Sequence, residues 1–118
     1  MGRAGTVGRA ATALSALLGL LAAGPPVRAQ SNAELAFDEA IAEELEQTSP
    51  GSARLWRKAT EAGYRRDLKS ASRLYEELTQ REPGFAPGFR TLAGVQLELG
   101  ERDRAIELAR HAVELDPA

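Results

Sequence analysis

Residues 52–118 repeat themselves at a fixed offset of 34 positions. Four identical pairs obey this offset: Ala59 and Ala93, Ala71 and Ala105, Leu74 and Leu108, and Pro83 and Pro117. Two similar pairs obey it as well: Leu55 with Phe89, and Glu82 with Asp116. A period of this length, with small residues at fixed places, is typical of stacked helix pairs. The offset predicts an all-α fold of stacked antiparallel helix pairs, one in residues 52–85 and one in residues 86–118.

The second unit resembles the tetratricopeptide repeat family. The matching residues are Phe89, the pair Leu92-Ala93, Gly100 at the turn, Ala105-Ile106, Ala112, and Leu115-Asp116-Pro117 at the end. The first unit matches through Ala59, Ala71, Tyr75, Leu78 and Pro83, but Lys58 stands at an apolar family position and Arg66 at the glycine turn. Small residues let the two helices of a unit approach closely, and glycine leaves a helix in a conformation that other residues resist. The resemblance implies a short right-handed solenoid of αα-hairpins.

A separate helix is predicted in residues 30–51, ahead of the repeats. Ser31 and Glu34 form a capping-box pattern, and Pro50-Gly51 is expected to end the element as a linker. Leu35, Ile41 and Leu45 are expected to cover the front of the first repeat. The segment carries six acidic residues and no basic one, whereas residues 52–85 carry eight basic residues. We therefore expect the acidic amphipathic helix to dock on the first repeat, although a solvated charged face is an alternative.

Residues 1–29 have the pattern of a cleaved signal peptide. Arg3 and Arg9 precede an apolar run over residues 10–23, and Gly24-Pro25-Pro26 breaks the helix before a cleavage site after Ala29. The run is shorter than the ~20 residues that span a bilayer, so we expect no stable membrane span after cleavage. An uncleaved anchor is the alternative. The Arg- and Ala-rich composition suggests a GC-rich bacterial genome, so the predicted location is periplasmic or secreted.

The residue inventory favours a non-enzyme without cofactor or metal. The chain has no cysteine and one histidine, His111, which leaves no set of nitrogen or sulfur ligands for a metal. Neighbouring acids such as Glu43 and Glu44 point about 100° apart on a helix and do not converge as an acid–base pair. All 17 acidic residues but only 12 of the 15 basic ones follow residue 29, which gives this part a net charge of about −5. This charge argues against a nucleic-acid partner.

The resemblance also implies a peptide-binding groove lined by the first helix of each unit. Carried over by position, its candidate residues are Trp56, Thr60, Gly63, Tyr64, Arg90, Gly94, Leu97 and Glu98. Tyr64 is expected to be exposed, while Trp56 could instead be a core residue. The basic flank of the first helix favours an acidic peptide, or the chain's own acidic helix, as the occupant. Gly94 stands where the family's carboxylate clamp requires Asn, so a peptide gripped by its C-terminal carboxylate is not expected.

The last helix, about Asp103 to Leu115, is expected to leave an open face. Its candidate residues are Ile106, Ala109 and Val113. Repeat units bury one face on the unit before and one on the unit after, so a second copy, another protein or further residues would have to cover it. The predicted function is an exported protein–protein interaction adaptor or scaffold of the cell envelope. The alternatives are a structural protein that self-assembles into homo-oligomers through this face, and a fragment of a larger protein.

Overall fold

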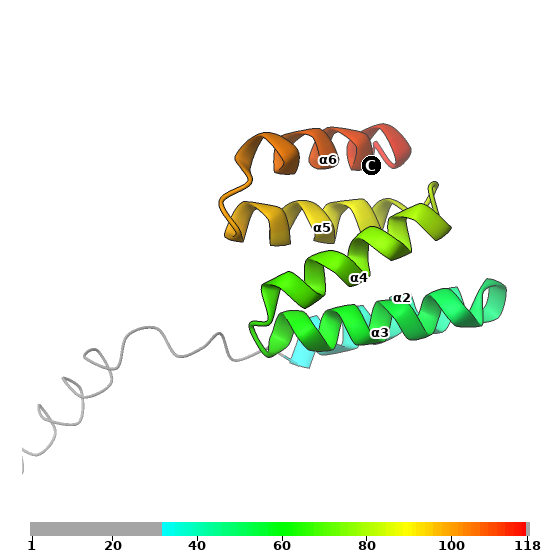
Figure 1. The fold of residues 1–118 in the computed structure, drawn as a ribbon. Helices are drawn as coiled ribbons and strands as arrows, with labels where there is room; N and C mark the ends of the chain where they lie inside the picture. Colours follow the sequence, from blue (N-terminus) through cyan, green and yellow to red (C-terminus); the bar gives the residue numbers. More distant parts are fainter. Residues whose placement is uncertain (1–31, 118) are drawn as a thin grey trace, which may run out of the picture. The chain divides into compact units, whose positions relative to one another are not determined.

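The structure, a computed structural model, describes residues 32–117, and this part of the chain is all-α. Its helices are α2 (Asn32–Thr48), α3 (Pro50–Tyr64), α4 (Leu68–Arg81), α5 (Ala86–Glu98) and α6 (Arg102–Leu115). Figure 1 shows successive helices running in opposite directions. The predicted all-α fold with five helices is confirmed for these residues. The signal peptide predicted for residues 1–29 and the cap at Ser31 lie outside the described part.

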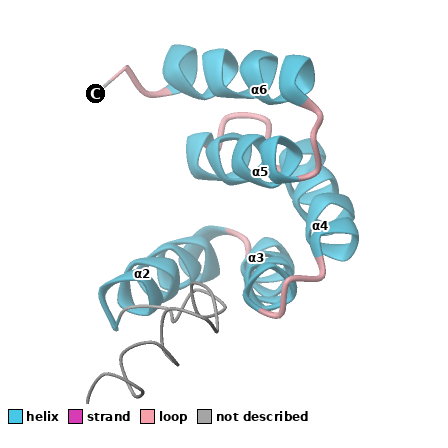
Figure 2. Ribbon diagram, turned by 90° about the vertical axis from the view of Figure 1, so that its left-hand side faces the viewer, coloured by secondary structure: helices cyan, strands magenta, loops and turns pink. Residues whose placement is uncertain are grey.

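Each helix packs on the helix that follows it in the chain. The contacts join α2 to α3, α3 to α4, α4 to α5, and α5 to α6. Figure 2 shows the helices in chain order, with α2 and α6 at the two ends of the row. This arrangement is what stacked helix pairs require, because each helix shares a core only with its neighbours.

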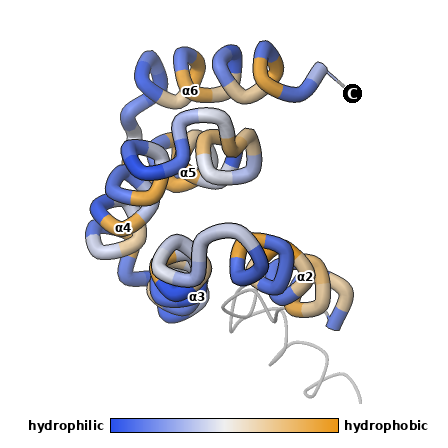
Figure 3. The backbone as a smooth tube through the Cα atoms, turned by 90° about the vertical axis from the view of Figure 1, so that its right-hand side faces the viewer, coloured by the Kyte–Doolittle hydropathy of each residue, from blue (hydrophilic) through white to orange (hydrophobic). Residues whose placement is uncertain are grey.

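Small residues at the repeated positions allow the helices to approach closely. Ala59 and Ala71 are completely buried where α3 meets α4, and Ala93 and Ala105 are buried at the same places in the second pair. Large side chains, Leu78 and Leu92 among them, fill the space beside these contacts. Figure 3 shows both hydrophilic and hydrophobic residues on every helix, as expected for amphipathic helices around one shared core.

The two turns inside the helix pairs have the same backbone conformation. Gly100 has a φ of 86°, and Arg66, 34 positions earlier, has a φ of 64°. Both residues follow the first helix of their pair, where a left-handed residue ends a helix. Glycine adopts this region without strain, whereas the Cβ of an arginine makes it sterically unfavourable. The first repeat therefore keeps the turn geometry of the second without its glycine.

The expected linker at Pro50-Gly51 is absent. Helix α2 ends at Thr48, and Pro50 and Gly51 already belong to the first turn of α3. Proline is well tolerated at this position, because the first backbone N–H groups of a helix have no partner within the helix. Ser49 alone joins α2 to α3, so α2 is held close to the first repeat.

Candidate functional site

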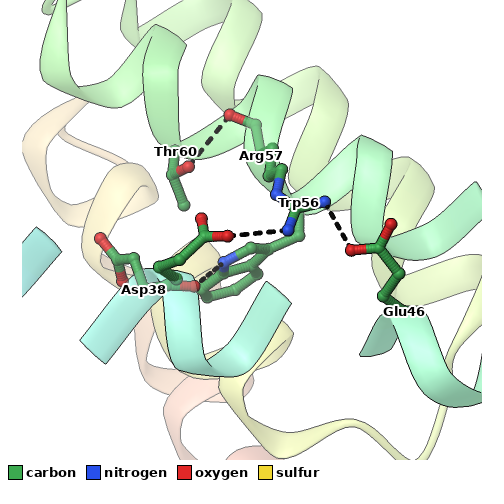
Figure 4. A network of polar contacts seen from close by, with 6 residues as sticks. Asp38, Glu46, Trp56, Arg57 and Thr60 are labelled. Atoms are coloured by element: carbon green, nitrogen blue, oxygen red, sulfur yellow. Dashed lines mark hydrogen bonds and ion pairs between the residues drawn. The ribbon is translucent and has the colours of Figure 1, made fainter. Parts of the chain in front are cut away.

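Helix α2 docks on α3 around Trp56. The indole is 1% exposed, and its Nε1 donates a hydrogen bond of 3.0 Å to the backbone oxygen of Asp38 (Figure 4). The edges of Tyr75 and Phe85 meet the indole at ring-centroid distances of 5.7 and 5.9 Å. Of the two roles that the sequence left open for Trp56, the structure has the core residue and not the groove residue.

The apolar side of α2 differs in one residue from the prediction. Ile41 and Leu45 are buried against the first repeat as expected, and Ala42 is buried between them. Leu35 was expected to join them, but its side chain is exposed, which corrects the prediction. Leu35 lies in the first turn of α2, ahead of the contact that centres on Trp56.

Charged contacts also join α2 to α3, as the charge pattern predicted. Arg57 donates to Glu39 at 2.8 Å and to Glu46 at 2.9 Å (Figure 4). The hydrogen bond from Arg57 lowers the pKa of Glu39, and the two carboxylates raise the pKa of the Arg57 guanidinium. Glu39 and Glu46 lie seven residues apart, or two helical turns, so one arginine bridges successive turns of α2. The acidic helix thus occupies part of the basic flank of α3.

The remaining α3 residues of the predicted groove, Thr60, Gly63 and Tyr64, are half-buried. The Thr60 hydroxyl donates to the backbone oxygen of Arg57 at 3.0 Å, within its own helix. Tyr64 is half-buried rather than exposed, and its hydroxyl oxygen is buried without a hydrogen-bond partner in the described part of the chain. The expectation that Tyr64 is exposed is therefore wrong. The docking of α2 on Trp56 removes that residue from the α3 side of the groove.

The α5 residues of the predicted groove, in contrast, lie on the surface. Arg90, Gly94 and Leu97 are exposed and follow one another at helical spacing along one face. Leu97 is 57% exposed, and a Cβ placed on Gly94 would meet nothing within 4 Å. We call Arg90, Gly94 and Leu97 the α5 stripe. Glu98 is also exposed, but it forms an ion pair with Arg66 and so ties the end of α5 to the first repeat.

A shallow depression on α4 was not predicted from the sequence. Its lining consists of Lys69, Ser72, Arg73, Glu76, Glu77 and Gln80. These residues come from a single helix and carry both signs of charge, a pattern that cannot be distinguished from a solvated helix face in the sequence. Arg104 of α6 approaches Glu76 at 3.8 Å beside it, and Gln96 of α5 donates to Ser72 at 2.7 Å.

The apolar face predicted on α6 is exposed among the described residues. Ile106 is 43% exposed, Val113 is 61% exposed, and Ala109 between them is exposed as well. On the adjacent side of α6, Ala105, Leu108 and Ala112 are buried. The ring of Phe89 meets His111 at 4.5 Å between centroids.

Asp38 and Glu39 are expected to change stability with pH in opposite directions. Burial raises the pKa of Asp38, with the charge of Glu34 as a second cause. A raised carboxyl pKa means that ionisation opposes folding, so Asp38→Asn should increase the thermal midpoint at pH 7 and change it little at pH 3. The pKa of Glu39 is lowered, so its ionised form supports folding. Glu39→Gln should decrease the midpoint at pH 7 and lose that effect at pH 3.

Thermal unfolding followed by circular dichroism at the two pH values tests this pair. The two variants are at adjacent positions, and each removes one negative charge, so they change the net charge of the protein equally. A decrease of the midpoint at pH 7 in both variants would contradict the assignment of Asp38 as a destabilising charge.

Comparison with protein-family models, with curated proteins and with solved structures found no match to this chain. No helix in residues 32–117 combines the length and apolar character needed to cross a membrane. Within the same residues, no cluster of three His, Cys, Asp or Glu side chains is arranged to hold a metal ion. Among the described residues, the surfaces open to a partner include the α5 stripe, the α4 depression, the apolar face of α6, and the exposed Leu35 and Phe37 on α2.

Proposed function

We propose that the protein is an exported adaptor of the tetratricopeptide-repeat type that binds partner proteins in the cell envelope. The observation that carries the proposal is the α5 stripe, where a cation, a bare backbone position and an exposed leucine follow one another on a helix held by both neighbours. The sequence pattern of residues 1–29 supports the exported location.

The α5 stripe has the chemistry of a peptide-binding surface. Leu97 offers apolar area that is exposed without a partner, while Arg90 offers a guanidinium for a carboxylate. Gly94 between them lets a partner's backbone approach the helix, because no side chain stands there. Helices on both sides of α5 fix its backbone, so a partner has to order only the exposed side chains on binding.

The spacing of the stripe specifies the ligand. Arg90 and Leu97 are seven residues apart, which corresponds to about 10 Å along the helix axis. A peptide in the extended polyproline II conformation has three residues per turn and rises about 3.1 Å per residue, so residues three positions apart lie on the same side and about 9 Å apart. The proposed ligand is therefore an extended segment that places an acidic residue and a large apolar residue three positions apart. Gly94 stands at the position where the family's carboxylate clamp requires Asn. The acidic group of the proposed ligand is therefore a side chain within the segment and not its C-terminal carboxylate.

Selection from a displayed library of random peptides against the purified chain tests this function. Enriched peptides are expected to share an acidic residue and an apolar residue at this spacing. Their binding should fall at least tenfold in Arg90→Glu and in Leu97→Ala, because each substitution removes one of the two recognised groups. The matched control is Glu77→Ala on the exposed side of α4. No enrichment, or binding that Arg90→Glu leaves intact, would exclude the α5 stripe as the adaptor surface.

A further inference from the structure

The chain uses equivalent helix positions three times at intervals of 34 residues. The three sets are Asp38, Ile41 and Leu45 on α2, then Ser72, Tyr75 and Thr79 on α4, then Ile106, Ala109 and Val113 on α6. In α2 the set lies under α3, where Trp56 bonds to the Asp38 carbonyl. In α4, Ser72 accepts a hydrogen bond from Gln96 of α5 and Thr79 lies beside Gly88 of α5, while the ring of Tyr75 also meets Trp56 of α3. In both cases the covering helix runs antiparallel to the helix that it covers (Figure 1).

The third set is the only one of the three that no helix in residues 32–117 covers. Ile41, Leu45, Tyr75 and Thr79 are buried, whereas Ile106 and Val113 are 43% and 61% exposed. The side chains on α6 are apolar where those on α2 and α4 include Asp38 and Ser72. Ile106, Ala109 and Val113 therefore lie at the positions that pack on another helix in the earlier units. Their side chains are also apolar, as in a helix-packing surface.

Opposite charges stand at the two ends of this face. Arg102 lies one turn before Ile106, and Asp116 follows three residues after Val113, directly after the helix. Neither Arg102 nor Asp116 forms an ion pair within the described part of the chain. Ala109, the smallest side chain of the set, lies midway between them. A second α6 laid antiparallel would bring each cation to an anion and the two alanines together.

We propose that two copies of this chain form a two-fold dimer through α6. In this dimer the two α6 helices are antiparallel and cross at Ala109, with Ile106 of each copy against Val113 of the other. Arg102 of each copy faces Asp116 of the other, and small residues at the crossing allow close approach. A two-fold interface uses the same patch on both copies, so that patch must be complementary to itself. The apolar face of α6 meets this condition, because its cation and its anion stand at opposite ends. The proposal is independent of the α5 stripe and extends the adaptor to a bivalent one.

Light scattering behind size exclusion, over a concentration series, tests the dimer. The purified protein is expected to have the mass of a dimer at high concentration. Val113→Glu should give a monomer with unchanged helical circular dichroism, because it places two charges in the interface. Leu97→Glu, an equally exposed apolar position on α5, is the control and should remain a dimer. A monomer at every concentration, or oligomers that grow beyond two copies, would overturn the proposal.

A cysteine at the crossing point tests the two-fold register. The chain has no cysteine, so Ala109→Cys introduces a single thiol. Mild oxidation is expected to give a disulfide-linked dimer, since a residue at the two-fold axis meets its own copy. Gly94→Cys on α5 is the matched control and should stay reduced at the same protein concentration. Equal cross-linking of both variants, or none at Ala109→Cys, would contradict the register.

The charge pair gives a second test of the register that does not depend on cross-linking. Arg102→Glu and Asp116→Lys are each expected to weaken the dimer, because each places like charges opposite one another. The double variant Arg102→Glu with Asp116→Lys should restore the dimer, since the introduced glutamate of each copy would then face the introduced lysine of the other. Restoration would not be expected for a foreign partner, and failure to restore would reject the antiparallel arrangement.

Discussion

Replacing Trp56 by alanine is expected to lower the free energy of unfolding by about 3–5 kcal/mol. The indole is fully buried between α2, α4 and the start of α5, against Tyr75 and Phe85. Its removal leaves a cavity that these rings cannot fill without moving their helices. A domain of this size has only a few kcal/mol of stability, so Trp56→Ala should be largely unfolded at 37 °C. Urea titration followed by circular dichroism measures the effect.

Trp56→Phe separates the indole's hydrogen bond from its volume. Phenylalanine keeps most of the apolar contact but leaves the Asp38 carbonyl without the Nε1–H donor at 3.0 Å. The expected loss is about 1–3 kcal/mol, smaller than that of Trp56→Ala. An exposed binding tryptophan would behave differently, because its replacement by alanine would leave the urea midpoint almost unchanged. That result would place Trp56 on the surface and contradict the docking of α2.

The 34-residue offset was sufficient to predict the fold because it reflects packing directly. Small residues recur at Ala59 and Ala93, and at Ala71 and Ala105, because the helices of each pair touch there. The resemblance predicted a special backbone conformation at Gly100, which is confirmed, but it gave Arg66 as a departure, and the left-handed conformation at Arg66 was not predicted. The charge difference between the acidic segment and the first repeat also predicted correctly that α2 docks, since Arg57 holds two carboxylates of α2.

The sequence could not predict which face of α3 the acidic helix covers. Trp56, Thr60 and Tyr64 fall on one stripe at helical spacing, and such a stripe suits a binding groove and a helix interface equally well. The choice depends on the crossing of α2 over α3, which is set by the single connecting residue Ser49 and by the contact of Trp56 with Asp38. On α5, by contrast, the exposed positions could be predicted, because the repeat alone determines which side of that helix is buried.

The turn after α3 provides the second large effect. Arg66→Gly is expected to raise the free energy of unfolding by about 1 kcal/mol, because glycine reaches a φ of 64° without the steric cost that arginine pays there. The reverse change in the equivalent turn, Gly100→Ala, should lower it by about 1 kcal/mol, since φ is 86° there. Nothing lies within 4 Å of a Cβ at position 100, so the loss would come from the backbone and not from a clash with a neighbour.

Arg66→Gly also removes the ion pair between Arg66 and Glu98, and this loss offsets part of the stability gained from glycine. A control variant is needed to separate the two effects. Both side chains are more than a third exposed, so the pair contributes at most about 1 kcal/mol. Glu98→Gln removes the pair while keeping the strained arginine, and it should lower stability slightly. In the Glu98→Gln background, Arg66→Gly has no ion pair to lose and should be more stabilising than in the natural chain. If Arg66→Gly lowers stability even there, the left-handed conformation at position 66 is not a source of strain, and the two turns are not equivalent.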